Sequence, residues 1–282
     1  MNGIWLFDDW MLEQSDGLER KWGKPTFVKE IFTKMPPTGW DGYGGFMSVF
    51  RDDRLGRYVM YLVNFPGRES NNRTPGVCSG EFVFRLQSDD PYNWPTPRWD
   101  PSAKLAWQGF DDVVVDQAGN PIWAHRVHTL AGTPLAERGY VSCVLDEPRH
   151  LTLGGFSDDG VRFTVDRSRP WLDPGSDQPG DILWNNEAAV YELFVRSVYA
   201  DRRVSLCTTE DFKKFSRPIT VLQPDAMDRV GTEFYDMPPS PYEDFHIGLL
   251  NVFKTDHFEK VSISNNWPQI KYFGRIETEL AY

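Results

Sequence analysis

Carboxylates stand at four widely spaced places in this 282-residue chain, each shortly before or inside a segment rich in β-branched and aromatic residues. If the fold brings these places together in a partly desolvated site, like charges raise the pKa of one carboxyl group and leave another ionised. Glycoside hydrolysis needs such a pair, because two carboxylates flank the bond that is cleaved. The carboxylates are Asp41, Asp111 with Asp112, Asp177 with Asp181, and Glu233.

The competing interpretation of each carboxylate is structural. Aspartate is common in β-turns because its side chain hydrogen-bonds to the backbone two residues further on. Asp111, Asp112 and Asp181 fit that interpretation best. Asp41 and Glu233 fit it less well, since both lie in runs that are rich in glycine and aromatic residues.

The elements that would position these carboxylates form a repeat. A hydroxyl residue followed by acidic residues recurs four times, and an aromatic residue follows each copy after a short interval. Apolar alternation before the copies and an extended stretch after them predict a tight turn between two strands. The copies are Ser15-Asp16-Gly17 with Trp22, Ser88-Asp89-Asp90 with Trp94, Ser157-Asp158-Asp159-Gly160 with Phe163, and Thr209-Glu210-Asp211 with Phe215.

A second repeated element, a predicted hairpin, lies between consecutive copies of the turn. Two hairpin strands and the two strands around each turn make a unit of roughly 50 to 70 residues, near the period of propeller blades. We therefore predict an all-β fold, a β-propeller. A β-sandwich is the alternative, but it does not explain why two motifs recur in one order. The hairpins run from 46–50 into 57–62, 113–115 into 121–124, 182–184 into 189–194, and 234–237 into 245–250.

The whole chain, 1–282, is predicted to form one propeller domain, in which residues 1–30 supply N-terminal closing strands and the blades follow from residue 40 to residue 282. In a propeller, the innermost strand of each blade lines a central channel. Carboxylates placed at the start of these strands would converge on one funnel. This convergence links the repeat to the chemistry.

Aromatic side chains near the proposed funnel are candidates for stacking on sugar rings, because tryptophan and tyrosine offer a broad apolar face with a polar edge. The candidates are Trp40, Tyr43, Trp184 and Tyr235. The alternative for each is ordinary core packing.

His125 and Arg126 are neighbours on one predicted strand, so their side chains point to opposite faces. The one that points inward is a candidate for binding substrate hydroxyls or for shifting the pKa of a carboxyl group. For His125, the alternative is a structural histidine whose ring nitrogens are satisfied by hydrogen bonds.

A net charge of −11 without a Lys/Arg cluster disfavours nucleic acid as a partner and leaves a small carbohydrate or oligosaccharide as the expected one. No apolar stretch approaches the ~20 residues needed to cross a bilayer. The first residues lack the features of a secretory signal, which predicts a cytoplasmic protein without a membrane partner. The sequence leaves open whether the chain is a monomer or a homo-oligomer.

Three cysteines, Cys78, Cys143 and Cys207, have no CxxC spacing and cannot all pair, which predicts buried free thiols in a reducing compartment and argues against structural zinc. Five histidines without paired spacing argue against catalytic zinc. No cofactor is therefore expected, except that Ca²⁺ in the channel remains compatible, since its oxygen ligands need no fixed spacing. No phosphate loop, nucleophile elbow or dinucleotide fingerprint is present, which excludes nucleotide-driven and serine-hydrolase functions.

Four stretches, 6–13, 57–61, 155–160 and 233–243, resemble bacterial glycoside-hydrolase-like proteins that belong with the five-bladed propellers of the family 32 and family 43 type. The resemblance spans nearly the whole chain through diffuse motifs. It implies an active-site trio with Asp41 as nucleophile or base, Asp177 as the orienting and charge-stabilising partner with Asp112 as its rival, and Glu233 as general acid.

The chain departs from those families in two respects. It lacks the Asn-Asp-Pro-Asn-Gly, Arg-Asp-Pro and Glu-Cys signatures of the fructan-cleaving branch, which argues against fructoside specificity. Its last residues, 276–282, resemble a strand that leads into a further turn, so either the chain is a fragment of a five-bladed protein or the N-terminal copy at Ser15 closes the ring. A non-catalytic carbohydrate-binding or scaffold propeller is the second function class, because a fold alone does not establish catalysis.

Overall fold

The computed structural model describes residues 45–64, 82–98, 100, 102–146, 149–176, 180–196, 202–242, 245–264 and 267–281, with Asp16 and Thr26 as isolated positions. These residues form strands β1 to β16 and two short 3₁₀ helices, η1 (Ala106–Gly109) and η2 (Ala136–Arg138). Within this part of the chain, no helix has the length and apolar character needed to cross a bilayer.

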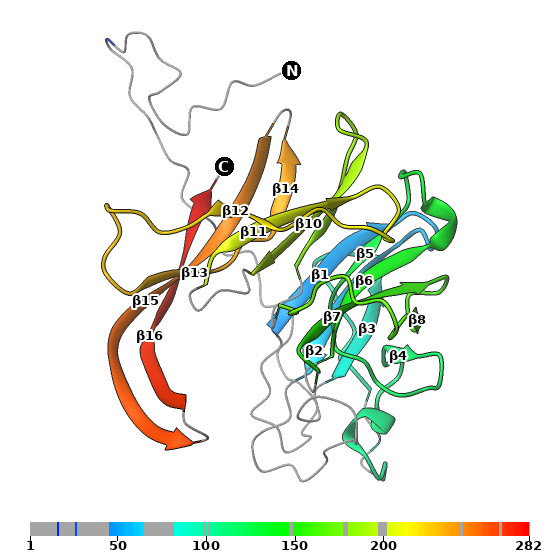
Figure 1. Cartoon of the computed structure of the whole chain (residues 1–282). Helices are drawn as coiled ribbons and strands as arrows, with labels where there is room; N and C mark the ends of the chain where they lie inside the picture. The colour runs from blue at the N-terminus through cyan, green and yellow to red at the C-terminus, as the bar shows by residue number, and fades with distance from the viewer. Residues whose placement is uncertain are drawn as a thin grey trace.

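The first two sheets come from the N-terminal half of the described chain (Figure 1). Blade 1 is a three-stranded antiparallel sheet with the order β1-β2-β3. Its strands are β1 (Gly45–Asp52), β2 (Arg57–Asn64) and β3 (Phe82–Ser88). Blade 2 has the order β4-β8-β7-β6-β5, and its strands are β4 (Val115–Asp116), β5 (Ala124–Thr129), β6 (Tyr140–Asp146), β7 (Leu151–Ser157) and β8 (Arg162–Val165).

The other two sheets follow in chain order, and Figure 1 shows blade 3 between blades 1 and 2 on one side and blade 4 on the other. Blade 3 has the order β12-β11-β10-β9, with β9 (Ile182–Asn185), β10 (Val190–Arg196), β11 (Val204–Thr209) and β12 (Ile219–Leu222). In blade 4, the long strand β15 pairs with β13 and β14 along one edge and with β16 along the other. Its strands are β13 (Thr232–Asp236), β14 (Pro239–Tyr242), β15 (Phe245–Ser264) and β16 (Trp267–Ala281).

Neighbouring blades share their cores face to face. One apolar cluster joins blades 1 and 2 and includes Tyr61 and Phe163. A second joins blades 2 and 3 and includes Cys143 and Cys207, and a third joins blades 3 and 4. A sheet that packs on both of its faces, against the sheet before it and the sheet after it, is the arrangement of a propeller. The predicted all-β propeller is thus confirmed, with four blades in the described residues, whereas a five-bladed form is not seen in them.

The two described cysteines agree with the prediction of buried free thiols. Cys143 and Cys207 are both buried and unpaired. Burial raises the pKa of both thiols, that of Cys207 to about 12. Both are therefore uncharged at neutral pH. Cys78 lies outside the described residues.

The repeated turn occupies one position in the blades, directly after the third strand. The hydroxyl of Ser88 ends β3 and accepts a hydrogen bond from Asp90 N at 3.1 Å. Ser157, at the end of β7, accepts one from Gly160 N at 2.9 Å. Thr209, at the end of β11, accepts one from Phe212 N at 2.9 Å. The copy at Ser15 lies outside the described residues apart from Asp16.

The aromatic residue after each described turn packs into an apolar cluster. Phe163 is fully buried between blades 1 and 2, Trp94 is 8% exposed against blade 1, and Phe215 packs against the cluster between blades 2 and 3. The spacing of turn and aromatic residue therefore reflects one requirement: the turn orients the chain so that the ring reaches the core.

One predicted hairpin differs from the structure. Residues 113–115 do meet Pro121, through a bridge at Val115, but they also extend blade 1, because Val114 N donates to Val83 O at 2.7 Å. The inner edge strand of blade 2 is instead β5. Asp111 and Asp112 therefore stand at the seam of blades 1 and 2 and do not open an inner strand. A run of valines is compatible both with the inner strand of blade 2 and with an edge of blade 1, so the composition of 113–115 did not distinguish the two positions.

Candidate functional site

The centre of the candidate site is supplied by β5, the strand at the edge of blade 2. The pairing of β5 with β6 shifts between Ala124 and Val127, so a bulge falls at residues 125 and 126. Bulges re-aim side chains and are common beside active sites. The backbone here is fixed from two sides: Ser142 Oγ donates to Arg126 O at 2.6 Å, and Val127 N donates to Ser48 Oγ on β1 at 3.0 Å.

The buried guanidinium of Arg126 holds two carboxylates from two other blades. Its Nη1 donates to Asp181, the residue directly before β9 of blade 3. Its Nη2 donates to Asp236 Oδ2, on β13 of blade 4, at 2.5 Å. The two carboxylate side chains are only 11% and 16% exposed. Side chains 55 and 110 residues away from Arg126 thus converge where blades 2, 3 and 4 meet.

The bulge in β13 explains how Asp236 reaches this place. The pairing of β13 with β15 shifts between Phe234 and Asp236, which breaks the ordinary alternation of side chains. Removing one partner from a buried, charged hydrogen-bonded group costs several kcal/mol, because the remaining charge is left buried without a partner. Arg126, Asp181 and Asp236 are therefore a strongly coupled set, which we call the central cluster.

His128 lies beside the central cluster, on the same strand, β5, as Arg126. Its Nε2 accepts a hydrogen bond from Ile182 N at 3.3 Å and lies 3.8 Å from Asp181 Oδ1. Burial, and secondly the charge of Arg126, lower the pKa of His128 from 6.5 to about 3. The imidazole is therefore neutral at neutral pH, and its Nε2 serves as an acceptor.

A second set of charged residues lies beside the central cluster, between blades 3 and 4. Glu233, on β13, contacts Nη1 of Arg202, and the Glu233 side chain is 12% exposed. The ring of Tyr235 lies between two guanidinium groups: the Cζ of Arg196 is 4.3 Å and that of Arg202 is 5.1 Å from its centroid. Arg196 Nε also donates to Tyr235 O at 3.2 Å. Cation–π contacts of this kind fix the ring but cover its faces.

The cavity at this place is small. A void of about 10 Å³ is lined by Gly180, Arg196, Tyr235, Asp236 and other residues of blades 3 and 4. That is about the minimum space for one water molecule. Of the central cluster, Asp236 lines this void, whereas Arg126 and Asp181 do not. Asp41 and its neighbours lie outside the described residues.

The structure describes only some of the residues that the sequence nominated. Trp40, Asp41, Tyr43 and Asp177 lie outside the described residues, and for His125 only the backbone, in β5, is described. The roles proposed for these five residues remain predictions.

Asp112 and Glu233 are described and take part in separate ion pairs. Asp112, with φ 52°, lies 3.4 Å from Arg85 on β3, and the Asp112 side chain is 42% exposed. Glu233 contacts Arg202 between blades 3 and 4. Asp112 and Glu233 therefore pair with different arginines, Arg85 and Arg202.

Trp184 and Tyr235, nominated for stacking on sugars, both have aromatic or cationic neighbours. Trp184 is half-buried, its ring centroid lies 4.7 Å from that of Tyr191, and its Nε1 donates to Asn186 Oδ1 at 2.7 Å. Tyr235 is held between Arg196 and Arg202 as described above. A sugar ring would have to approach each of them at an edge or displace a neighbour.

Sequence reasoning did not single out Asp236, and it treated Asp181 as a turn residue. In the structure Asp181 is 8% exposed and reaches Arg126 instead. The sequence did contain one signal for this site: Arg126 and His128 are two residues apart on one strand, so their side chains share a face, which indicates polar groups on that face. The spacing does not identify Asp181 and Asp236 as their partners, because these two residues come from other blades.

A further buried acid, Glu192 on β10, lies apart from the central cluster. Asn185 Nδ2 donates to its Oε1 at 2.8 Å, and His246 Nε2 lies 2.8 Å from its Oε2. These contacts join blade 3 to blade 4. Among the described residues, no three His, Cys, Asp or Glu side chains are grouped so that they could hold a metal ion. Calcium in the channel stays a prediction.

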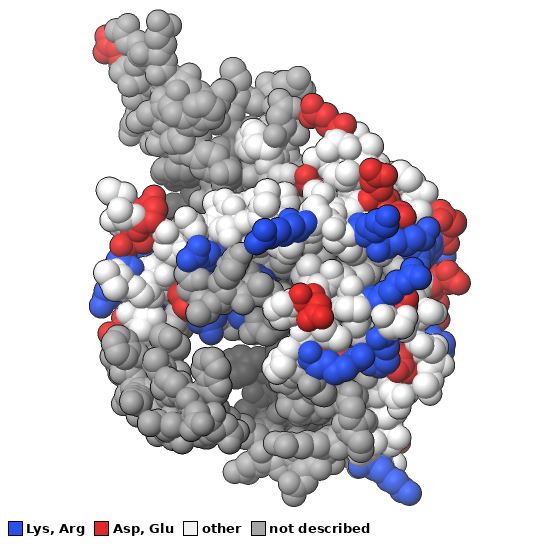
Figure 2. Space-filling model, viewed as in Figure 1, with Lys and Arg blue, Asp and Glu red and all other residues white. Residues whose placement is uncertain are grey.

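Charged side chains outside the site are mixed in sign. On the face shown in Figure 2, Lys and Arg side chains lie beside Asp and Glu side chains over the described residues. Ion pairs such as Arg57 with Asp89 at 2.9 Å and Lys254 with Glu277 at 2.6 Å are partly or largely exposed. Exposed pairs of this kind contribute little to stability, in contrast to the central cluster.

Comparison with known proteins gives similar solved structures but no family assignment. No family model matches the chain, and no curated protein matches it. An exo-β-1,3-galactanase from Phanerochaete chrysosporium, solved with galactose, is 9% identical with a TM-score of 0.49, over 73% of this chain and 41% of that one. A fructofuranosidase variant from Schwanniomyces occidentalis, complexed with fructosylnystose, is 14% identical with a TM-score of 0.49, over 80% of this chain and 42% of that one.

An α-L-arabinofuranosidase from Fusarium graminearum, in complex with an iminosugar inhibitor, is 12% identical with a TM-score of 0.48, over 87% of this chain and 65% of that one. This chain spans about two fifths of the galactanase and of the fructofuranosidase. At these identities and scores, no catalytic residue is carried over from them to this chain.

Proposed function

We propose that this protein is a glycoside hydrolase whose site lies where blades 2, 3 and 4 meet. The observation that carries the proposal is Arg126, which holds Asp181 and Asp236 together in a buried position. Carboxylates that share one guanidinium are no farther apart than the roughly 5 to 10 Å at which glycosidases place their two carboxyl groups. The sequence resemblance to the family 32 and family 43 propellers supports the same reaction.

The roles follow from the contacts. A carboxylate that accepts a hydrogen bond from arginine suits a base, a nucleophile or a charge-stabilising group, because these parts need the ionised form. We assign Asp181 and Asp236 to such parts, next to Asp41 and Asp177, which keep the roles that the resemblance implies. Glu233 remains the proposed general acid, and Asp112 the rival of Asp177.

The substrate is proposed to be a small carbohydrate or oligosaccharide. Trp40, Tyr43, His125, Trp184 and Tyr235 are the proposed contacts with its rings and hydroxyl groups. Trp184 and Tyr235 would act through their edges, since their faces have neighbours.

A second candidate function, carbohydrate binding without catalysis, is favoured by a specific observation. Each of the described carboxylates Asp181, Asp236 and Glu233 contacts an arginine, and the void beside Asp236 is only about 10 Å³. Glu233 would have to exchange its contact with Arg202 for a contact with the substrate before it could act as acid.

The test is hydrolysis of a panel of aryl glycosides, both pyranosides and furanosides of both anomers. Wild type would be compared with Asp41→Asn, Asp177→Asn, Asp181→Asn, Asp236→Asn and Glu233→Gln, which keep the shape of each side chain. We expect each to lower kcat by about 10²-fold or more, as removal of acid–base groups does. Asp112→Asn decides between Asp112 and Asp177, and Asp158→Asn, an exposed turn residue, is the matched control.

Circular dichroism of each variant would separate lost chemistry from lost folding. No turnover of any substrate by the wild type, together with saturable binding of one of the sugars, would overturn the enzyme in favour of the binding protein. Unchanged turnover in Asp181→Asn and Asp236→Asn would remove the central cluster from the mechanism.

A further inference from the structure

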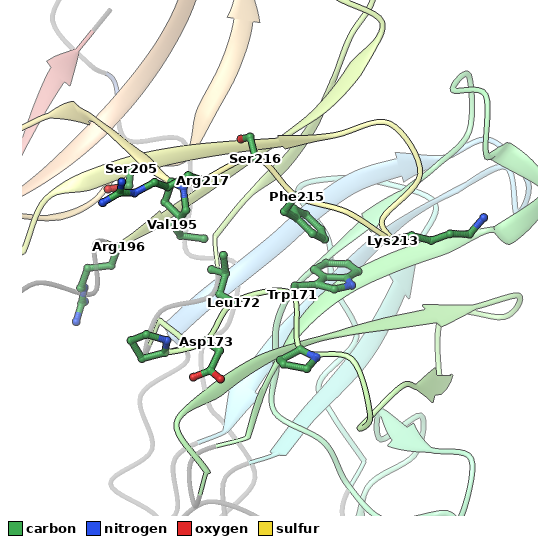
Figure 3. A pocket seen from close by; sticks show the side chains of 13 residues that line it. Trp171, Leu172, Asp173, Val195, Arg196, Ser205, Lys213, Phe215, Ser216 and Arg217 are labelled. Carbon is green, nitrogen blue, oxygen red and sulfur yellow. The ribbon is translucent and has the colours of Figure 1, made fainter.

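A pocket of about 640 Å³ lies between blades 2 and 3, outside the central cluster. One wall is the segment 170–174 that follows β8, and the other is formed by β10, β11 and the segment 213–218 that precedes β12 (Figure 3). Pockets that bind small molecules have volumes of roughly 300 to 1,000 Å³. The pocket is therefore large enough to take a ligand, unlike the void beside Asp236.

The floor of the pocket is formed by buried residues, one of which, Ser205, carries a hydroxyl group. Leu172, Val195 and Ser205 line the pocket, and they are 7%, 4% and 2% exposed. The Ser205 hydroxyl can donate a hydrogen bond to a ligand oxygen in the pocket or accept one from a ligand hydroxyl.

Two cations stand at the rim of the pocket. Lys213 lies 3.6 Å from Asp211, whereas Arg217, within the described part of the chain, has neither an ion pair nor a hydrogen bond. Asp173 is the one carboxylate among the lining residues. Since the whole chain carries a net charge of −11, a rim with more cations than anions is a local exception and favours an anionic ligand.

The aromatic residues of the pocket lie together at one end, where Lys213 also stands. Figure 3 shows Phe215 and Trp171 toward one end and Arg217 and Ser205 toward the other. Phe212 packs against both rings, with centroids 5.2 Å from Trp171 and 6.3 Å from Phe215, and the Trp171 and Phe215 centroids are 5.1 Å apart, so the two rings form one aromatic wall of the pocket. Arg196 also lines the pocket, but its guanidinium lies over Tyr235.

We propose that this interblade pocket binds a carboxylate-bearing sugar unit, that is, a uronic acid residue of an acidic oligosaccharide. The sugar carboxylate pairs with Arg217, because guanidinium binds carboxylates through two parallel hydrogen bonds. A sugar hydroxyl accepts from or donates to Ser205, and an apolar ring face packs against Phe215. The choice of a sugar rests on the proposed function, whereas the choice of an anion rests on the pocket itself.

The test is calorimetric titration of the full chain with trigalacturonic acid and, as the neutral counterpart, galactotriose. We expect saturable binding of the acidic trisaccharide only. Arg217→Ala should weaken it by about tenfold or more, as the loss of a charged hydrogen bond does. Ser205→Ala should weaken it severalfold without a change in circular dichroism. Lys214→Ala is the matched control, since Lys214 is the exposed neighbour of Lys213 and does not line the pocket.

The outcomes separate this proposal from the proposed function. Asp236→Asn should lose turnover and bind the acidic trisaccharide as the wild type does. No saturable binding of trigalacturonic acid would overturn the pocket proposal and leave the hydrolase untouched. Equal binding of galactotriose, or equal loss in Lys214→Ala, would also overturn it, because the charge at Arg217 would then not be recognised.

Discussion

The central cluster and the interblade pocket differ in what they offer a ligand. At the central cluster, three charged side chains from three blades are buried and paired with one another, and the adjoining void is about 10 Å³. At the pocket, about 640 Å³ is open, the hydroxyl residue Ser205 lines the floor, and the cations stand at an exposed rim. Among the described residues, the central cluster and the pocket of about 640 Å³ thus lie in different places.

The difference has a physical basis. Charges that are removed from water must be paired, and close pairing leaves little space. Charges at an exposed rim stay solvated and can remain unpaired at little cost. The first arrangement positions groups accurately, and the second receives a ligand. Each prediction below tests whether this division is real.

The largest expected difference is in stability. Arg126→Ala leaves Asp181 and Asp236 buried without their shared partner, so it should lower the free energy of unfolding by about 3 to 5 kcal/mol. Arg217→Ala, at the rim of the pocket, should change it by no more than about 0.5 kcal/mol. Urea unfolding followed by circular dichroism measures both. Similar values for the two variants would mean that the central cluster is not strongly coupled.

The second prediction concerns pH. His128 has a pKa of about 3 in the folded chain and an ordinary value of 6.5, so between these values the unfolded chain binds the proton that the folded chain rejects. The contribution of neutral His128 to the free energy of unfolding is complete above pH 6.5. It is lost as the pH falls toward 3, by up to about 1.4 kcal/mol per pH unit. His128→Gln should flatten that part of the stability profile.

The exposed His150 provides the control for this pH dependence. His150→Asn is the matched substitution of an exposed histidine, and asparagine tolerates the φ of 52° at this position. An unchanged slope in His128→Gln would mean that the imidazole beside Asp181 is not held in its neutral form.

The smallest stability effect is expected at the floor of the pocket. Ser205→Ala removes one hydroxyl that lines the pocket, so the free energy of unfolding should stay within about 1 kcal/mol of the wild type. Thermal unfolding monitored by near-UV circular dichroism suits this comparison. Ser142→Ala is the matched variant, since the buried Ser142 Oγ donates to Arg126 O at 2.6 Å. A larger loss for Ser205→Ala than for Ser142→Ala would show that Ser205 has a structural role.

Much of the fold could be predicted from local sequence. The hydroxyl residues Ser88, Ser157 and Thr209 each end a third strand, and the predicted hairpins of β1 with β2 and of β9 with β10 are present. These features depend on short-range turn chemistry and on period-two alternation, which the sequence displays directly. The exception was the segment 113–115, whose valines are compatible with pairing in blade 1 as well as in blade 2.

The site was less predictable, because its contacts join separate blades. Nothing near Arg126 indicates that Asp181 and Asp236 are its partners, since no local pattern records which blades converge. The bulges at residues 125–126 and before Asp236 also changed which face these side chains take, and period-two reasoning does not include them. Glu233 was nominated from its sequence context, but its contact with Arg202 could not be foreseen.

The measurement that tests the account most directly is kcat/KM of wild type, Asp236→Asn and Asp112→Asn on the best substrate of the aryl glycoside panel, with folding checked by circular dichroism. The account predicts a loss of about 10²-fold or more in Asp236→Asn, as for a group that acts in the transition state, and a value near wild type in Asp112→Asn. Full activity in a folded Asp236→Asn protein would contradict the central cluster as the catalytic site.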